Sequence, residues 1–463
     1  MLSENEKYLQ MTETPIPKLI SSLALPAIFS MVVTSLYNMA DTFFIGKIDG
    51  TEEQVTSATG AVAVVFSLMA IIQACGFFFG QGSGNYISRA LGNKDHDSAE
   101  KMAIFGFVTS ILFGLVIAVL GIVFLEPLAY LLGSTKTILP YAREYMLYIL
   151  IAAPIMCGSL VLNNQLRFQG NAFIAMIGIV LGAVINVGLD ALFVLVLDMG
   201  TAGAGLATAI GQACSFIILL IGTKLSNNVR LKLKAYRFKL KMFLEVCRGG
   251  TPSLARQGLS SVATLCLNFA AKACGGDPAI AAMGIVARIM MFCFSAALGF
   301  GQGFQPVCGY NYGAKKYGRV KEGYFFCIKV AAVFVFAVSL TMFIFADFFI
   351  GLFSEDAKVL EIGSLALRAQ CIAFQGIGII TFTNMMLQTM GKVVPATLLS
   401  MGRHGLFFLP IVFVLPSAAG VTGLTLIQPI ADLLTFILSL VFAIIEIKRL
   451  NKLIEQKKQE TSD

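Results

Sequence analysis

This 463-residue sequence is most informative in what it has little of. Only 13% of its residues are charged, and it contains no tryptophan and only two histidines. A soluble domain is about 25% charged and 45–50% apolar, whereas this chain is 57% apolar with a mean hydropathy of +0.82. The alternating pattern of a transmembrane barrel is absent. Composition therefore excludes an ordinary soluble protein and predicts an all-α membrane protein.

Signals for metal sites, disulfides and catalysis are also missing. The ten cysteines include no CxxC pair, and most lie within apolar runs, so we interpret them as small buried hydrophobic residues. With two histidines and no HExxH sequence, metal catalysis has no support. No combination of a nucleophile and a base indicates an enzyme. We therefore expect no enzymatic activity and no cofactor.

Positive charge is concentrated in loops on one side of the predicted membrane. The net charge is +8, and its densest run, residues 224–241, reads KLSNNVRLKLKAYRFKLK. An excess of Lys and Arg marks the cytoplasmic side, so we interpret this run as a topology signal and a contact for lipid headgroups, not a nucleic-acid site. The sequence predicts a multi-pass plasma membrane protein with both termini in the cytoplasm.

Twelve apolar segments approach or exceed the roughly 20 residues needed to cross a bilayer. They span residues 16–46, 55–89, 102–126, 141–168, 172–198, 201–223, 251–273, 279–311, 322–352, 359–389, 393–415 and 420–447. These segments divide the chain into a tail (1–15), a first lobe (16–223), a basic linker (224–249), a second lobe (250–447) and a second tail (448–463).

The two halves carry related sequences. The matched positions share one constant offset in the numbering, and they are Gly80 with Gly301, Gln81 with Gln302, Gly82 with Gly303, Lys94 with Lys315, Glu126 with Asp347, and Gly170 with Gly391. Each half has six spans, so the two copies have the same orientation and should be related by a pseudo-two-fold axis along the membrane normal. A central cavity between two six-helix lobes is then the expected binding site.

The first segment carries an acid, Asp41. A carboxylate inside a membrane helix costs about 2.5–3.5 kcal/mol on insertion scales, so function is the default hypothesis. Asn38 and Asp41 share a helical face with Tyr37 beside it. Pro26 removes a backbone donor, which predicts a bend. The alternative is that Asp41 caps the next element or lies in the outer headgroup region.

A second acid, Asp190, lies in the fifth segment, four residues after Asn186 and on the same helical face. The fourth and sixth segments contribute further polar residues: Tyr145, Asn163, Thr208 and Gln212. The second half has Leu267 and Ile411 at the positions equivalent to Asp41 and Asp190, so these acids are confined to the first lobe. An interfacial position near the outer boundary is the alternative for Asp190.

Charged residues also occur at membrane depth in the second half, and the sequence assigns them no role: Arg256, Arg288, Arg368, Arg403 and Asp432. Arg288 and Arg368 fit structural pairing or snorkelling. Arg403 and His404 lie near the start of a span, which favours snorkelling to the inner surface. Asp432 is a candidate partner for one of these arginines.

Seven motifs, in order along nearly the whole chain, carry a resemblance. They are LP at Leu25-Pro26, YNMADTFFIG from Tyr37, GQGSGNYISRALG from Gly80, RFQGNA from Arg167, NVGLD from Asn186, AGAGLATAIGQ from Ala202 and GTPS from Gly250. The sequence resembles the multidrug and toxic compound extrusion (MATE) family, most closely its DinF-like branch. The resemblance implies two six-helix lobes in a V and alternating access. It also implies export of cationic or amphipathic small molecules in exchange for protons or sodium.

Residue roles follow from the same resemblance. Asp41 is similar to the first-helix carboxylate that takes the coupling ion in the family. The residues similar to the partners of that carboxylate are Asn186, Asp190 and Thr208, with Tyr37 and Tyr145 close by. Pro26 is similar to the bend point. A sodium ion could be held by Asp41, Asn186 and Asp190, and the sequence does not choose between sodium and protons. The second-lobe acid of another branch has no match here.

Two other functions remain as alternatives. A flippase for lipid-linked precursors shares the superfamily architecture, but it would be expected to line its cavity with arginines for pyrophosphate, and the first lobe has few buried cations. An intramembrane enzyme needs a set of catalytic groups that does not appear. We expect a monomer in a lipid bilayer with small-molecule substrates.

Overall fold

The computed structural model describes residues 3–48, 51–226, 229–232 and 236–460, and its description omits the side chains of residues 38–42. All regular structure within these ranges is helical. The helices of the first half are α1 (Glu4–Glu13), α2 (Ile16–Ile45), α3 (Glu52–Gly92), α4 (His96–Val123), α5 (Leu125–Leu131), α6 (Leu139–Phe168), α7 (Ala172–Asp190), the π-helix η1 (Ala191–Val196) and α8 (Gly200–Ser226).

The second half contains a further set of helices, two of which include a break. They are α9 (Leu240–Gly313), α10 (Tyr317–Ile344), α11 (Ala346–Gly351), α12 (Ala357–Phe374), α13 (Ile377–Thr389), α14 (Val393–Met401), the π-helix η3 (Gly402–Leu406) and α15 (Phe408–Glu460). Helix α9 joins two spans across Gly276 (φ 63°), and α15 contains a similar break at Gly420 (φ 55°). Glycine adopts this left-handed conformation without a Cβ clash.

These breaks reconcile the helices with the twelve predicted spans. Nine helical stretches in the described residues are long and apolar enough to cross a membrane, and α12 with α13 makes a tenth that is bent by 52°. Dividing Leu240–Gly313 at Gly276 and Val393–Glu460 at Gly420 gives twelve. The fold class predicted from hydropathy is therefore confirmed, and the predicted span at 359–389 corresponds to α12 and α13, which meet at the bend.

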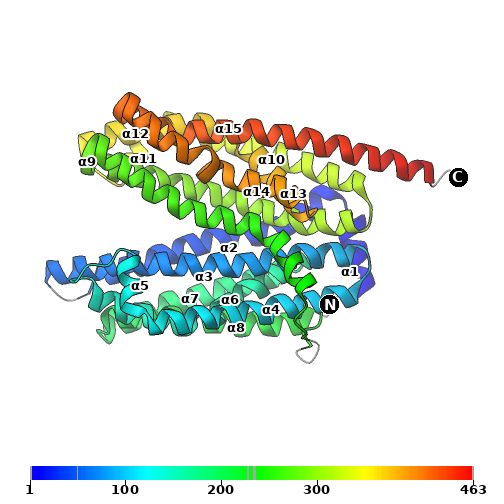
Figure 1. The fold of residues 1–463 in the computed structure, drawn as a ribbon, viewed down its shortest axis with the longest axis horizontal. Coiled ribbons are helices and arrows are strands. Elements are labelled where there is room, and N and C mark those ends of the chain that lie inside the picture. Colours follow the sequence, from blue (N-terminus) through cyan, green and yellow to red (C-terminus); the bar gives the residue numbers. More distant parts are fainter. Residues whose placement is uncertain (1–2, 49–50, 227–228, 233–235, 461–463) are drawn as a thin grey trace.

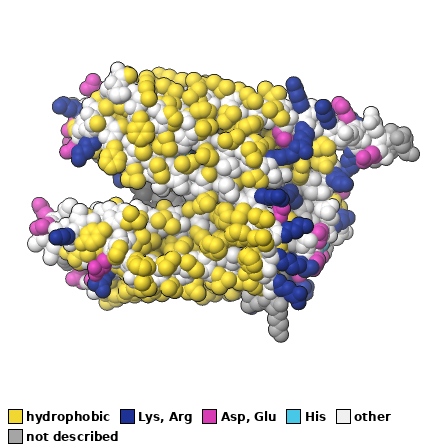
Figure 2. Space-filling model, viewed as in Figure 1, with side chains coloured by type: hydrophobic (Ala, Val, Ile, Leu, Met, Phe, Trp, Pro, Cys, Tyr) yellow, Lys and Arg dark blue, Asp and Glu magenta, His cyan; other side chains and the backbone are white. Residues whose placement is uncertain are grey.

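The helices form two lobes (Figure 1). Helices α2 to α8 make the first lobe, and α9 to α15 make the second. The lobes meet at the right-hand end of the view, where both termini lie, and diverge towards the left. Figure 2 shows Lys and Arg gathered at the end where the lobes meet, with hydrophobic side chains covering the sides of both lobes. The boundaries assigned to the tails, lobes and linker stay predictions.

The repeat is visible in matching local geometry. Asn163 Nδ2 donates to the Ala175 carbonyl at 2.9 Å, and Asn384 Nδ2 donates to the Ala396 carbonyl at 2.7 Å. Donors and acceptors of the two bonds are separated by the same offset as the sequence repeat. Gly170 and Gly391, the pair matched in sequence, also share a left-handed conformation, with φ of 81° and 78°.

The lobes cross most closely where the C-terminal ends of α3 and α9 pass each other. A Cβ added at Gly92 would lie 2.2 Å from the Tyr310 carbonyl oxygen, and one at Gly313 would lie 2.1 Å from that of Arg89. These two contacts are symmetry mates, because the offset of the sequence repeat relates Gly92 to Gly313 and Arg89 to Tyr310. Only glycine allows the two backbones to approach this closely.

Polar contacts join the lobes at the same end. Arg167 donates to Gln302 Oε1, and Gln305 Nε2 donates to Gln81 Oε1 at 3.2 Å. Arg89 Nη1 donates to the Thr389 carbonyl at 2.5 Å. The two lobes are therefore hydrogen-bonded at the end rich in Lys and Arg.

The polar tail predicted at 1–15 contains the helix α1, begun by a capping box between Ser3 and Glu6. Lys7 Nζ donates to the Gly170 carbonyl at 2.9 Å in the first lobe. On the other side, Asn311 Nδ2 donates to the Met11 carbonyl at 3.0 Å. Helix α1 thus binds both lobes at their shared end.

Candidate functional site

A cavity of about 440 Å³ lies between the lobes. Its walls come from α2, α3, α6, α7 and α8 on one side and from α9, α12, η3 and α15 on the other. Much of the surface is apolar, and it includes the five methionines Met31, Met156, Met283, Met290 and Met291. Flexible, polarisable thioethers adapt to ligands of different shape, so the cavity suits a range of apolar molecules.

The first-lobe wall contains five of the residues predicted from sequence: Tyr37, Asn163, Asn186, Thr208 and Gln212. Asn186 Nδ2 on α7 donates to Thr208 Oγ1 on α8 at 3.3 Å, and both side chains are buried. Asn186 Oδ1 accepts no hydrogen bond from the described residues. This wall therefore offers hydroxyl and amide groups, and the Asn163 amide is held by its bond to α7.

Asp190 and Tyr145 lie behind this wall. Both are fully buried, and neither lines the cavity. Tyr145 packs against α8 at Gly205, where an added Cβ would approach its ring to 2.9 Å. Asp190 is the last residue of α7 and directly precedes the π-helix η1. Wide π turns occur frequently at functional sites, so the chain geometry around Asp190 is consistent with the predicted role.

Two predicted residues, Asn38 and Asp41, lie outside the described side chains, and their roles stay predictions. Pro26 lies inside α2, which runs from Ile16 to Ile45 without an interruption in helical assignment. Ser30 Oγ donates to the Pro26 carbonyl at 2.9 Å. The role of Pro26 as a bend point also stays a prediction.

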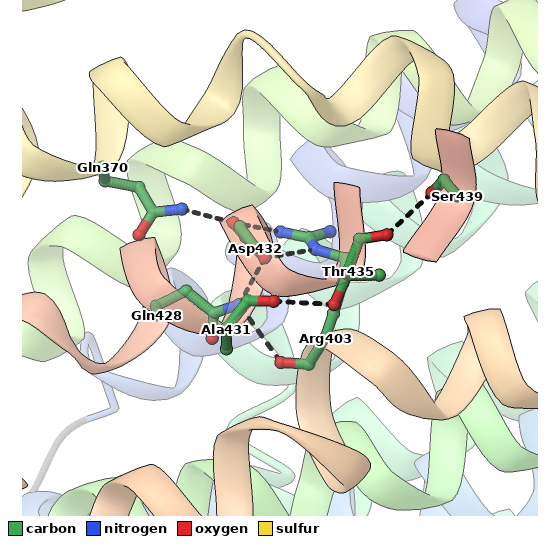
Figure 3. Close-up of polar contacts among 7 residues, drawn as sticks. All are labelled: Gln370, Arg403, Gln428, Ala431, Asp432, Thr435 and Ser439. Atoms are coloured by element: carbon green, nitrogen blue, oxygen red, sulfur yellow. Dashed lines mark hydrogen bonds and ion pairs between the residues drawn. The ribbon is translucent and has the colours of Figure 1, made fainter. Parts of the chain in front are cut away.

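The second-lobe wall is built around an ion pair (Figure 3). Arg403 donates from Nε to Asp432 Oδ1 at 2.8 Å and from Nη2 to Oδ2 at 3.2 Å. Gln370 Nε2 donates to Oδ2 at 2.7 Å, and Gln428 Nε2 donates to Oδ1 at 2.8 Å. Asp432 is fully buried. Four donors therefore satisfy this carboxylate, which makes it a structural anchor for Arg403.

These contacts decide two expectations from the sequence. Asp432 does pair with an arginine, as predicted. The expectation that Arg403 snorkels to the inner surface is wrong, because its guanidinium binds Asp432 and stacks on Phe294 with its Cζ 4.7 Å from the ring centroid. Arg368 pairs with Asp347 at 2.7 Å, away from the cavity, as expected of a structural residue.

Sequence reasoning assigned no role to the polar residues of the second-lobe wall. Arg256, Gln257, Arg403 and His404 line the cavity together with Gln370 and Gln428. Arg256 was noted as a cation at membrane depth without a function. Gln370 and Gln428 were missed. The signal for each was an uncharged amide inside an apolar run, and Gln428 also lies four residues before Asp432, on the same helical face.

Known proteins share this architecture. The sequence profile of the family described as MatE matches residues 26–192 and 252–414, one match in each half of the chain. The chain belongs to the MatE family. The resemblance seen in the motifs is thereby confirmed. MatE proteins are transporters and not enzymes, so the expectation of no enzymatic activity is confirmed at the level of the family.

Similar proteins extend over nearly the whole chain. The multidrug export protein MepA of Staphylococcus haemolyticus strain JCSC1435 is 29% identical over 424 residues, which is 91% of each chain. MepA of Staphylococcus aureus strain MRSA252 is 26% identical over 423 residues, covering 91% of this chain and 92% of its own. A solved multidrug resistance MATE transporter, described as outward-facing, has a TM-score of 0.88 at 24% identity, covering 96% and 98% of the two chains. This last likeness shows the fold.

Proposed function

We propose that this MatE protein exports amphipathic small molecules by antiport with protons or sodium, through alternating access of the central cavity. The observation that carries the proposal is a methionine-rich cavity between two lobes that are hydrogen-bonded at one end and diverge at the other. The name of the MepA relatives, multidrug export protein, supports drugs as the cargo.

The coupling site is proposed in the first lobe. Asp41, Asn186, Asp190 and Thr208 would hold the ion, with Pro26 allowing α2 to change shape as the ion binds. Support comes from the Asn186–Thr208 hydrogen bond at the cavity and from the full burial of Asp190 behind it. Two carboxylates in one dry pocket cannot both be ionised cheaply, so binding of a cation there is favourable.

The conformation described here is proposed to face outward. Lys and Arg gather at the end where the lobes meet, and this distribution is expected on the cytoplasmic side. The end at which the lobes diverge would then face the outside (Figure 1). In this state the substrate leaves to the exterior, and the polar contacts of Arg167 and Gln81 must break before the cavity opens inward.

A flippase for lipid-linked pyrophosphates is less well supported. A pyrophosphate carries more than one negative charge and favours several guanidinium groups. In the described lining of the cavity, Arg403 is already bound to Asp432, which leaves Arg256 as the arginine not held by an ion pair.

Purified protein in liposomes tests the proposed function. Efflux of a preloaded fluorescent amphiphile is measured under a proton gradient and under a sodium gradient, each imposed alone, with protein-free liposomes as the control. Faster efflux under at least one gradient, abolished when that gradient is collapsed, is the expected result. Efflux that is independent of both gradients contradicts antiport.

A further inference from the structure

Arg256 lines the cavity, and the described residues give its guanidinium no hydrogen bond or ion pair. It lies on α9, sixteen residues after the start of that helix at Leu240 and within the predicted span 251–273. Its side chain is half-buried. A guanidinium at this depth normally pairs with an anion or with carbonyl groups.

The nearby acid cannot serve as that partner. Asp432 accepts two hydrogen bonds from Arg403 and one each from Gln370 and Gln428, so its two oxygens are fully occupied. The described residues that line the cavity include no Asp or Glu. Asp432 neutralises Arg403, so Arg256 leaves this wall with one excess positive charge.

The surroundings of Arg256 fit a ligand with an anionic head and an apolar body. Gln257 and Ser260 lie on the same helix and line the same cavity, so amide and hydroxyl donors flank the guanidinium. Across the cavity lie apolar side chains such as Phe77 and Met156. When the cavity closes around a ligand, an unpaired guanidinium would lose water without compensation, and an anion bound to it would remove that cost.

We propose that Arg256 binds an anionic group, a carboxylate or sulfonate, of the transported amphiphile, with Gln257 and Ser260 as flanking donors. This inference rests on the proposed export function and narrows its cargo: the second-lobe wall favours anionic or zwitterionic amphiphiles over purely cationic ones. Arg403 holds the shape of the wall through Asp432 and is a positioning residue.

Binding is tested with purified full-length protein in nanodiscs and two tritiated probes that share one ring system. Naphthaleneacetate carries a carboxylate, and naphthylmethyl-trimethylammonium carries a fixed positive charge. The variants are Arg256→Gln, which removes the charge, and Arg256→Lys, which keeps it. Arg368→Gln is the matched control, because it removes a cation from the same lobe at a site away from the cavity.

Wild-type protein is expected to bind naphthaleneacetate more tightly than the ammonium probe. Arg256→Gln should weaken binding of naphthaleneacetate about tenfold, the usual scale for one charged hydrogen-bonded contact, without weakening binding of the ammonium probe. Arg256→Lys should retain most of the affinity, and Arg368→Gln all of it. Equal binding of the two probes by wild type, or unchanged naphthaleneacetate binding in Arg256→Gln, overturns the inference. Should Arg256→Gln not fold, the wild-type preference decides.

Transport separates this inference from the function on which it rests. A protein that binds naphthaleneacetate through Arg256 but moves neither probe under an ion gradient contradicts antiport and leaves the binding site standing. A protein that pumps the ammonium probe and does not bind naphthaleneacetate contradicts the anionic site alone.

Discussion

Each lobe contains the same contact between its fifth and sixth helices, but the residues next to that contact differ between the lobes. Gly182 packs on Ser215 in the first lobe, and Gly402 packs on Thr435 in the second, each with an added Cβ 2.7 Å from its partner. The separation in sequence between the two glycines equals that between their two partners. The contact that brings the fifth and sixth helices of each lobe together is therefore common to the two halves.

The residues close to this contact differ in chemical type between the two lobes. At the same separation in sequence, Ala183 corresponds to Arg403, and Gln212 corresponds to Asp432. The second lobe thus holds a buried ion pair where the first has a methyl group and an amide. The scaffold kept its packing while the cavity walls acquired different chemistry, charged in one lobe and neutral in the described part of the other.

We propose that this difference gives the two lobes separate tasks. A carboxylate whose two oxygens already accept four hydrogen bonds has no open position to ligate a sodium ion, so Asp432 has a structural role. Asp190 is fully buried in the first lobe, behind the neutral side chains of Asn186 and Thr208. We therefore propose ion coupling in the first lobe and recognition of substrate charge in the second.

The largest effect is expected for Asp41→Asn. The substitution keeps the shape of the side chain and leaves a hydrogen-bonding group but removes the charge. Gradient-driven efflux from proteoliposomes should fall to the protein-free background under both proton and sodium gradients. Asp190→Asn should impair efflux through the same site, and the double variant should be little worse than the worse single one. Wild-type efflux by Asp41→Asn would place coupling elsewhere.

Asp432→Asn should mainly damage stability. The change leaves the largely buried guanidinium of Arg403 without its counter-charge, which costs about 3–5 kcal/mol for a buried pair. Thermal unfolding in detergent should show a marked loss, and adding Arg403→Gln should recover part of it because no unpaired charge remains. If Asp432→Asn were as stable as wild type, Asp432 would not be a structural acid, and its contrast with the first-lobe acids would be lost.

Gly92→Ala and Gly313→Ala probe the symmetric crossing where the lobes meet. Each new Cβ would clash with a backbone carbonyl of the opposite lobe, at 2.2 Å and 2.1 Å, so the helices must separate. We expect a loss of about 1–3 kcal/mol and an increased distance between spin labels placed across this end. Because the contacts are symmetry mates, the two variants should behave alike, and a large effect in only one would break the symmetry argument. Gly258→Ala is the control, since an added Cβ there meets no atom within 4 Å.

The smallest expected effect concerns docking of α1. Burial lowers the pKa of Lys7 from 10.5 to about 8. Since the folded-state pKa lies below the unfolded value, unfolded α1 binds more protons between these values, and docking becomes more stable as pH rises from about 8 towards 10.5. The chain has no tryptophan, so Tyr8→Trp provides a single fluorescent reporter on α1. Its signal should change as the pH rises from about 8 to 10.5, the range over which docking becomes more stable, and Lys7→Met should abolish this change.

Much of the fold was predictable because hydropathy and repeated motifs report spans directly. The break at Gly276 falls between two predicted segments, and the break at Gly420 falls at the first residue of the predicted segment 420–447, since polar or small residues interrupt the apolar runs there. The 52° bend between α12 and α13 was not predicted, because Gln375 and Gly376 lie inside an apolar run that composition alone reads as one span.

The candidate site was predictable where polar residues stand out in apolar helices, as Asn186 and Thr208 do. The position of Arg403 was not, because distance from the start of a span does not report the π turn of η3 that lies at Gly402–Leu406. Gln370 on α12 reaches Asp432 on α15 only through tertiary packing of the two helices. Gln428 lies one helical turn before Asp432 on α15 and donates to it and to the Arg403 carbonyl.

The central claim, coupling in the first lobe and not in the second, is tested most directly by comparing Asp190→Asn with the double variant Arg403→Gln/Asp432→Asn. The measurement is the ratio of efflux with a gradient to efflux without one, in proteoliposomes of matched protein content, so that changes in substrate affinity cancel. The central claim predicts a ratio well below that of wild type for Asp190→Asn and a wild-type ratio for the double variant. A coupled Asp190→Asn protein alongside an uncoupled double variant would contradict it.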